Sequence, residues 1–168
     1  HRGAWGIGAD IDFTPGRAET DPYGQTHVHL SQTYKGVPVL DEEVIVHVLD
    51  DAGKATTTGE PRPIQPTDIS SAVSSGEALA AVRTHIHANV LGELKEADLD
   101  AELTLVPNLD FVPQRLIHRV RLKSVPEGYT ETYLKGGLTE FWVDAQTGEV
   151  WKSWSRNAPG IGTGRGAG

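Results

Sequence analysis

The sequence contains no cysteine and no methionine among its 168 residues. The absence of cysteine excludes a disulfide framework, a thiolate nucleophile and every zinc site that uses cysteine ligands. No apolar run approaches the roughly 18 residues that a membrane-spanning helix needs, so no membrane segment is predicted. Basic residues are also scarce, because 15 lysines and arginines against 23 acidic residues give a formal net charge of −8. Nucleic-acid binding needs a basic face, so a neutral or basic protein is the more suitable partner.

The remaining composition is typical of a folded chain with many turns. Hydrophobic residues make up 38% of the sequence, which also contains 19 glycines and 10 prolines. This length allows one ordinary domain or two small ones. Residues 1–26 contain few large apolar side chains, and we expect a loose arm or a single short strand there. Because the chain starts at His1 rather than at methionine, we also expect a processed fragment, with any signal peptide upstream.

Residues 27–59 have the pattern of an antiparallel β-meander. Val28 and Leu30 alternate with polar residues, and Lys35 and Gly36 supply the turn that follows. The apolar run resumes after this turn, is interrupted by three acidic residues at 41–43, and returns as a β-branched strand over 44–49. This segment therefore predicts short strands joined by tight turns.

A boundary and a second unit are predicted after residue 59. Three prolines lie within residues 60–68, where they stiffen the chain and block ladder hydrogen bonds, so we interpret this segment as a linker. Ser74 and Glu77 form a capping box that starts a helix predicted to end near Leu91. Strand patterns return at 103–106, 116–123, 141–143 and 150–154, with Gly148 in the last hairpin loop. The predicted fold class is α+β, with the meander packed against a helix-plus-antiparallel-sheet unit over residues 69–157.

One part of the meander is similar to a known module. The segment from Gln32 to Val39, with the strand over 44–48, resembles the fungalysin/thermolysin propeptide module of secreted zinc metalloproteases. The sequence departs from that module at residues 40–43, where an aromatic residue and glycines are typical. We assign the module to residues 27–59 and leave residues 1–26 as an N-terminal arm. The motif residues are Gln32, Tyr34, Gly36, Val37, Pro38 and Val39.

The later segments resemble other parts of the same precursors. Residues 69–157 are similar to the PepSY domain that follows this module in the thermolysin family, most closely in the hairpin over 141–150. The glycine-rich residues 158–168 are similar to the opening of the mature catalytic domain. Cleavage of the precursor is expected between Ser153 and Ala158 or after Pro159, but not between Ala158 and Pro159, because proline lacks the N–H of an extended substrate. The expected processing junction consists of Ser155, Arg156, Asn157, Ala158 and Pro159.

The resemblance implies a propeptide that is secreted or extracytoplasmic and acts as an intramolecular chaperone and inhibitor of its own protease. Its partner would be the cognate catalytic domain, and neither nucleic acid nor a membrane is expected. Because the sequence contains no His-Glu-x-x-His helix, we expect no enzymatic activity in this chain. Zinc and calcium are expected only in the catalytic domain of the precursor. The alternative is a free-standing extracytoplasmic PepSY-type module that binds peptides or inhibits other proteases.

Five histidines could suggest a metal site, but simpler roles are more frequent for such residues. His27 and His29 point to one face of a strand, which gives two ligands where zinc normally takes three or four. His85 and His87 lie two apart on the predicted helix and face different directions. His118 alternates with apolar residues and is interpreted as an inner-face histidine. The sequence therefore predicts no metal site.

Two groups of charged residues also have simple interpretations. The acidic stretches at 41–51 and 93–102 could bind calcium or a basic partner, but neither has the spacing of an EF-hand, and solvated loops are favoured. Four basic residues alternate along one predicted strand, where they could meet an acidic surface or face water. We interpret them as an exposed face. They are Arg115, Arg119, Arg121 and Lys123.

Overall fold

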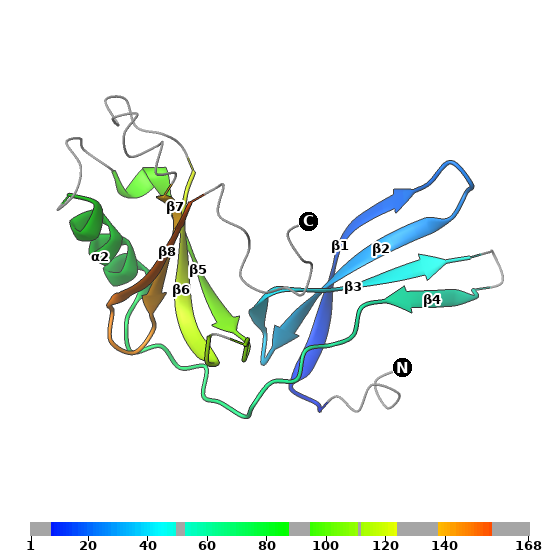
Figure 1. Cartoon of the computed structure of the whole chain (residues 1–168), viewed down its shortest axis with the longest axis horizontal. Helices are drawn as coiled ribbons and strands as arrows, with labels where there is room; N and C mark the ends of the chain where they lie inside the picture. Colours follow the sequence, from blue (N-terminus) through cyan, green and yellow to red (C-terminus); the bar gives the residue numbers. More distant parts are fainter. Residues whose placement is uncertain (1–7, 50–52, 88–94, 111, 124–137, 156–168) are drawn as a thin grey trace. The chain divides into compact units, whose positions relative to one another are not determined.

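The computed structural model describes residues 8–49, 53–87, 95–110, 112–123 and 138–155 (Figure 1). The chain divides into two compact units. Unit 1 contains His1–Thr67 and Leu105–Gln114, and unit 2 contains Asp68–Thr104 and Arg115–Gly168. Most of the described elements are β-strands, and an α-helix packs on the sheet of unit 2, which is consistent with the predicted α+β class. Within the described residues, no helix combines the length and the apolarity that crossing a membrane requires.

Unit 1 is built on four antiparallel strands that neighbour one another in chain order. They are β1 (Ile11–Thr20), β2 (Thr26–Tyr34), β3 (Val37–Val48) and β4 (Ala55–Thr58). The predicted meander is confirmed, and so is its first turn, because Lys35 and Gly36 have φ angles of 47° and 81°. The segment 105–114 also belongs to this unit, where Leu105 forms a parallel bridge with Val39.

The expectation of a loose arm or a short strand over residues 1–26 needs correction at β1. This strand is ten residues long and pairs with β2 from Ile11, opposite Tyr34, to Thr20, opposite Thr26. Its register shifts between Pro15 and Ala18, which marks a bulge. Most of its side chains are exposed, so it has no apolar alternation for a sequence pattern to detect. Ladder hydrogen bonds to β2, rather than a buried face, hold it in the sheet.

The acidic residues at 41–43 also behave differently from the prediction. They do not separate two strands, because β3 runs through them without a break. Asp41 has a φ of 52°, in the left-handed region that favours glycine, and the pairing of β2 with β3 shifts between Ser31 and Thr33. The apolar pattern is therefore interrupted by a bulge within one strand rather than by a loop.

Unit 2 contains the helix and a second group of strands, in the order β5-β6-β7-β8. Strands β6 and β7 pair antiparallel, as do β7 and β8. The hairpin loop between β7 and β8 contains Gly148 at a φ of 75°, as predicted. The bounds are α2 (Ser75–His87), the 3-10 helix η1 (Glu96–Asp98), β5 (Leu99–Val106), β6 (Arg115–Leu122), β7 (Leu138–Asp144) and β8 (Val150–Ser155).

Helix α2 begins with the predicted capping box. The Ser74 backbone N–H donates to Glu77 Oε2 over 2.7 Å, and the Glu77 N–H donates to Ser74 Oγ over 3.2 Å. The last four residues of the predicted helix, 88–91, lie outside the described residues. One face of α2 packs on the sheet and forms the core of this unit, which consists of Ala78, Val82, Ile86, Leu99, Val120, Phe141 and Val143.

Candidate functional site

The motif residues of unit 1 form the end of the β2–β3 hairpin. Gln32 is 1% exposed and Tyr34 is 4% exposed, while Val37 and Val39 are also buried. Gly36 lies in the turn with a positive φ, and Pro38 is half-buried at the start of β3. Four of the six side chains therefore point into the unit. Their position indicates that the motif builds the module rather than displaying side chains to a partner.

Gln32 fastens the proline-rich segment to the sheet. Its Nε2 donates to the carbonyl oxygen of Arg62 over 2.8 Å, and its Oε1 accepts from the Arg62 backbone N–H, also over 2.8 Å. The Arg62 side chain is held as well, because its Nε donates to Glu42 Oε1 over 2.9 Å. The buried side-chain amide of Gln32 thus forms hydrogen bonds with the backbone N–H and carbonyl of Arg62, which lies between two prolines and is not part of a strand.

Gln114 and Tyr34 also hold the same segment. Gln114 repeats the arrangement, since its Oε1 accepts from the Gln65 backbone N–H over 2.9 Å and its Nε2 donates to the Gln65 carbonyl over 2.8 Å. The Tyr34 hydroxyl accepts from the Thr67 N–H over 3.2 Å. Residues 61–67 are therefore held by side chains of unit 1, to which they belong. The sequence has no local feature that reveals these long-range partners.

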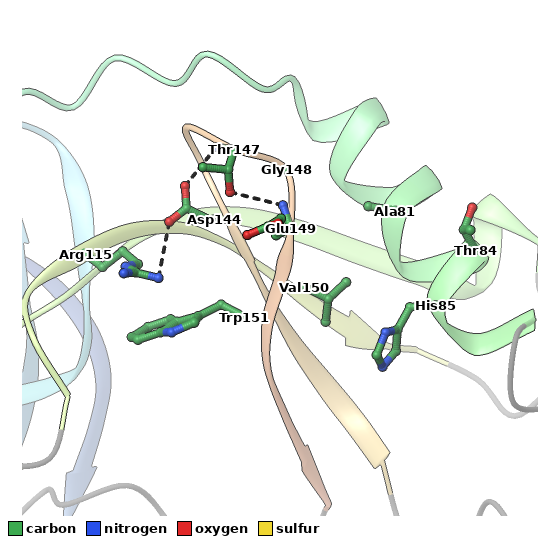
Figure 2. Close-up of a pocket in the computed structure, with 10 residues that line it drawn as sticks. All are labelled: Ala81, Thr84, His85, Arg115, Asp144, Thr147, Gly148, Glu149, Val150 and Trp151. Atoms are coloured by element: carbon green, nitrogen blue, oxygen red, sulfur yellow. Dashed lines mark hydrogen bonds and ion pairs between the residues drawn. The ribbon is translucent and has the colours of Figure 1, made fainter.

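A groove of about 800 Å³ lies in unit 2 between α2 and the β7–β8 hairpin (Figure 2). Ala81, Thr84 and His85 line it from the helix, and the hairpin supplies the opposite wall. The wall contains both apolar and polar side chains. The residues of the hairpin and of β6 that line the groove are Arg115, Asp144, Thr147, Gly148, Glu149, Val150 and Trp151.

Arg115 and Asp144 organise one end of this groove. The guanidinium lies 3.4 Å from Asp144 Oδ2 and stacks over the Trp151 ring, with 4.1 Å between Cζ and the ring centroid. Asp144 Oδ1 accepts from the backbone N–H groups of Gln146 and Thr147 over 2.8 and 2.9 Å. Asp144 thus fixes the loop of the β7–β8 hairpin, and Arg115 contacts both strands of this hairpin through Asp144 and Trp151. One end of the groove is therefore held in place by contacts within unit 2.

The basic residues of β6 do not simply face water as predicted. Arg119 donates from Nε to Glu140 Oε1 over 2.8 Å, and its side chain is only 18% exposed. Arg121 lies 3.8 Å from Asp100 in a more exposed pair. Acidic residues on neighbouring strands thus pair with three of the four residues in the row. Their cross-strand partners could not be read from the sequence of β6 alone.

The predicted histidines fall into different environments. His118 is 4% exposed, which confirms an inner-face position, and its Nε2 lies 2.7 Å from the Val73 carbonyl oxygen. His85 packs its ring against Phe141 at 6.1 Å between centroids. His27 and His29 lie on β2, where each contacts groups on other parts of unit 1. No group of three potential ligands suited to a metal ion occurs among the described residues.

The expected processing junction begins where the described structure ends. Ser155 is the last residue of β8, and Arg156, Asn157, Ala158 and Pro159 lie outside the described residues, as does the glycine-rich segment after them. The extended strand up to Ser155 agrees with the predicted end of the patterned sheet.

Comparison with known proteins identifies one part of the chain. No curated protein matches it. Residues 11–56 match the family model of the fungalysin/thermolysin propeptide motif. The match includes β1, β2, β3 and the start of β4, so it begins upstream of the His27 boundary suggested by the resemblance. The PepSY-like interpretation of residues 69–157 stays a prediction. Unit 1 thus contains a fungalysin/thermolysin propeptide motif, folded as the antiparallel sheet described above.

Proposed function

We propose that this chain is the propeptide of a secreted thermolysin-like zinc metalloprotease, in which it acts as an intramolecular chaperone and inhibitor of the catalytic domain. The propeptide motif over residues 11–56 is the observation that carries this proposal. Residues 69–157 would form the PepSY-like domain that follows. Zinc and calcium would belong to the catalytic domain, and this chain would contribute binding rather than chemistry.

Both roles follow from binding one state of the partner in preference to others. A propeptide that binds the folded catalytic domain better than the unfolded chain shifts the folding equilibrium by mass action. The same complex is inactive if the segment after β8 occupies the substrate cleft. Cleavage within the junction of residues 155–159 would then remove the covalent link and allow the two parts to separate.

Unit 1 offers a surface for this partner. Val28 and Leu30 on β2 alternate with polar residues, Val46 and Val48 on β3 are separated by His47, and the register puts all four on one side of the sheet; we call these four residues the valine face. All four are half-buried, and the described part of unit 1 contains no helix. The strands that carry the valine face lie within the matched motif, so we propose the cognate catalytic domain as the partner that covers it.

Inhibition in trans tests the proposal. The chain should inhibit its cognate mature protease more strongly than unrelated metalloproteases, and it should raise the yield of active enzyme when the denatured catalytic domain is refolded with it. Absence of both effects would reject the propeptide role. Equal inhibition of all the proteases tested would instead favour the free-standing inhibitor.

A pair of variants tests the valine face. Val46→Lys places a charge at the centre of the face and should weaken inhibition about tenfold or more. Val46→Thr keeps the β-branched shape and serves as the matched control, with a smaller loss. Circular dichroism establishes that both variants remain folded. Equal inhibition by Val46→Lys and the wild type would place the partner elsewhere.

A further inference from the structure

We propose that His27 and His47 form a pH-sensitive contact in unit 1, in which the folded sheet accommodates one added proton and a second proton separates β2 from β3 at the end of the sheet where Thr26 pairs with Val48. This end is formed by the directly opposed pairs Thr26–Val48, His27–His47 and Val28–Val46. We refer to His27 and His47 as the histidine pair.

The two imidazole rings meet through the same kind of ring atom. Nδ1 of His27 lies 2.5 Å from Nδ1 of His47, and the rings are edge to face, with centroids 4.8 Å apart. Each nitrogen is either a donor or an acceptor, depending on where the proton resides. A hydrogen bond between them therefore requires one Nδ1–H and one bare Nδ1.

The outer nitrogens determine which ring donates. His27 Nε2 lies 3.0 Å from Asp21 Oδ2, and an ionised carboxylate only accepts, so this nitrogen carries a proton. The neutral His27 ring then has a bare Nδ1, which accepts from Nδ1–H of His47. His47 Nε2 lies 2.7 Å from Thr58 Oγ1 and accepts from its hydroxyl. One continuous series of donors thus runs from Thr58 through both rings to Asp21.

The first and the second proton added to the histidine pair have different sites available to them. The first can add to His47 Nε2, because the Thr58 hydroxyl can rotate and accept instead of donate. The second would have to add to His27 Nδ1, which already accepts from His47. Two N–H groups would then point at each other across 2.5 Å, so the contact must break.

Acidic residues lie beside His27 in the histidine pair. Glu19 on β1 lies opposite His27 in the register, and Asp21 contacts it directly. The hydrogen bond with His27 is the main cause that holds the pKa of Asp21 below its usual value, so this carboxylate stays ionised while histidines titrate. On β4 the pair faces the uncharged Thr56 and Thr58, and the charged Lys54 immediately precedes that strand.

His29 is the remaining titratable group on this side of β2. Its Nδ1 lies 2.8 Å from Glu43 Oε1, and its Nε2 lies 3.2 Å from the Arg17 guanidinium and 3.5 Å from Glu19. Arg17 can only donate, so a neutral His29 donates from Nδ1 to Glu43 and accepts at Nε2. A proton on Nε2 would oppose the Arg17 donor, but Glu19 Oε1 lies 3.5 Å away and can accept from it, so His29, unlike the histidine pair, has a carboxylate available to each nitrogen.

Breaking the pair affects the turn at the end of β1 and β2. Asp21 Oδ1 accepts from the backbone N–H groups of Tyr23 and Gln25 over 2.9 and 3.0 Å. The carboxylate that holds this turn is thus the one that His27 positions through Oδ2. Movement of His27 would therefore loosen the Asp21–Gln25 turn together with the Thr26–Val48 end of the sheet.

The test combines imidazole NMR with unfolding of the full chain between pH 7.5 and 5. The ¹⁵N shifts of wild-type protein should show one bare and one protonated Nδ1 in the histidine pair near neutral pH. The ordinary pKa of a histidine side chain is about 6.5. Below that pH the two histidines of the unfolded chain can bind two protons, whereas the folded histidine pair accommodates only one. The folding equilibrium constant should then fall about tenfold per pH unit from this pair alone.

His47→Gln supplies the comparison, because its amide can still donate to His27 and accept from Thr58. The folding equilibrium constant of His47→Gln should therefore lack the tenfold decrease per pH unit that the histidine pair contributes in the wild type. His85→Gln, the same change in unit 2, should retain the wild-type dependence. Equal pH dependence of wild type and His47→Gln would overturn the proposal. So would folded wild-type protein with both rings doubly protonated and the β2–β3 hydrogen bonds intact, a readout that decides the question even if the variant fails to fold. None of these measurements involves a protease, so their outcome is separate from that of the proposed function.

Discussion

The side-chain amide of Gln32 forms with the backbone of Arg62 both hydrogen bonds that a residue of a neighbouring strand would form. Gln32 lies on β2 and is 1% exposed, whereas Arg62 lies in the proline-rich segment. An amide side chain has one acceptor and donors in the geometry of a peptide group, so it can replace a strand where no strand is present.

Gln32→Leu should therefore lower the free energy of unfolding by about 2 kcal/mol or more, because the Arg62 N–H and carbonyl lose buried partners. Denaturant unfolding measures the loss. Gln114→Leu removes the same pair of contacts from Gln65 at a more exposed position and should cost less. A smaller loss for Gln32→Leu than for Gln114→Leu would contradict this explanation.

The capping box of α2 predicts that the stability of the protein decreases at acidic pH. Hydrogen bonds from the backbone and side chain of Ser74 hold the pKa of Glu77 below its ordinary value of 4.5. Because the folded state favours the ionised carboxylate, Glu77 stabilises the fold at pH values above its ordinary pKa. This stabilisation is lost as the pH falls through the lower pKa that Glu77 has in the folded state. Between pH 6 and 3, wild-type protein should lose more thermal stability than Glu77→Gln. Glu149→Gln, an exposed carboxylate in the β7–β8 hairpin, is the control, and parallel curves for wild type and Glu77→Gln would reject the prediction.

Two arginines of β6 should differ in their effect on stability. Arg119→Ala leaves Glu140 with only part of its hydrogen bonding in a half-buried position and should cost about 2 kcal/mol. Arg121→Ala breaks a pair at 3.8 Å between side chains that are 43% and 52% exposed, so its cost should be about 0.5 kcal/mol or less. Chemical denaturation of both variants measures the difference, and equal losses would show that burial does not determine the strength of these pairs.

Substitutions at two glycines distinguish the effect of a positive φ angle from the effect of a steric contact. Gly59 and Gly24 have φ angles of 88° and 82°, so alanine is strained at both positions by about 1 kcal/mol. A Cβ at Gly59 would also lie 3.0 Å from the Glu43 carbonyl oxygen, whereas a Cβ at Gly24 would meet nothing within 4 Å. Gly59→Ala should therefore lower the melting temperature more than Gly24→Ala does. Equal shifts would mean that the backbone near Glu43 moves without cost.

Local features of this chain were predictable because their signals lie close together in the sequence. Ser74 and Glu77 are three residues apart and make the predicted reciprocal bonds, and Gly36 and Gly148 occupy turns with positive φ. Each feature depends on one stretch of backbone. Propensity and spacing therefore suffice to predict it.

Features that depend on distant partners were missed or misinterpreted. Strand β1 lacks apolar alternation because β2 holds it through backbone bonds, and Arg119 appeared solvated because Glu140 lies on another strand. The interruption at residues 41–43 was visible, but a bulge and a loop give the same loss of pattern until the partner strand is known. The candidate groove in unit 2 likewise depends on side chains from α2, β6, β7 and β8, which no single segment reveals.

The bulge in β1 has a consequence for self-association. As the first strand of its sheet, β1 presents ten residues of backbone at an edge where another chain could add a strand. Pro15 removes one donor from this strand, the shifted register before Ala18 disturbs its regular pairing, and the exposed charges of Arg17 and Glu19 oppose close stacking. These features blunt the edge and disfavour the addition of strands from other chains, including further copies of this one.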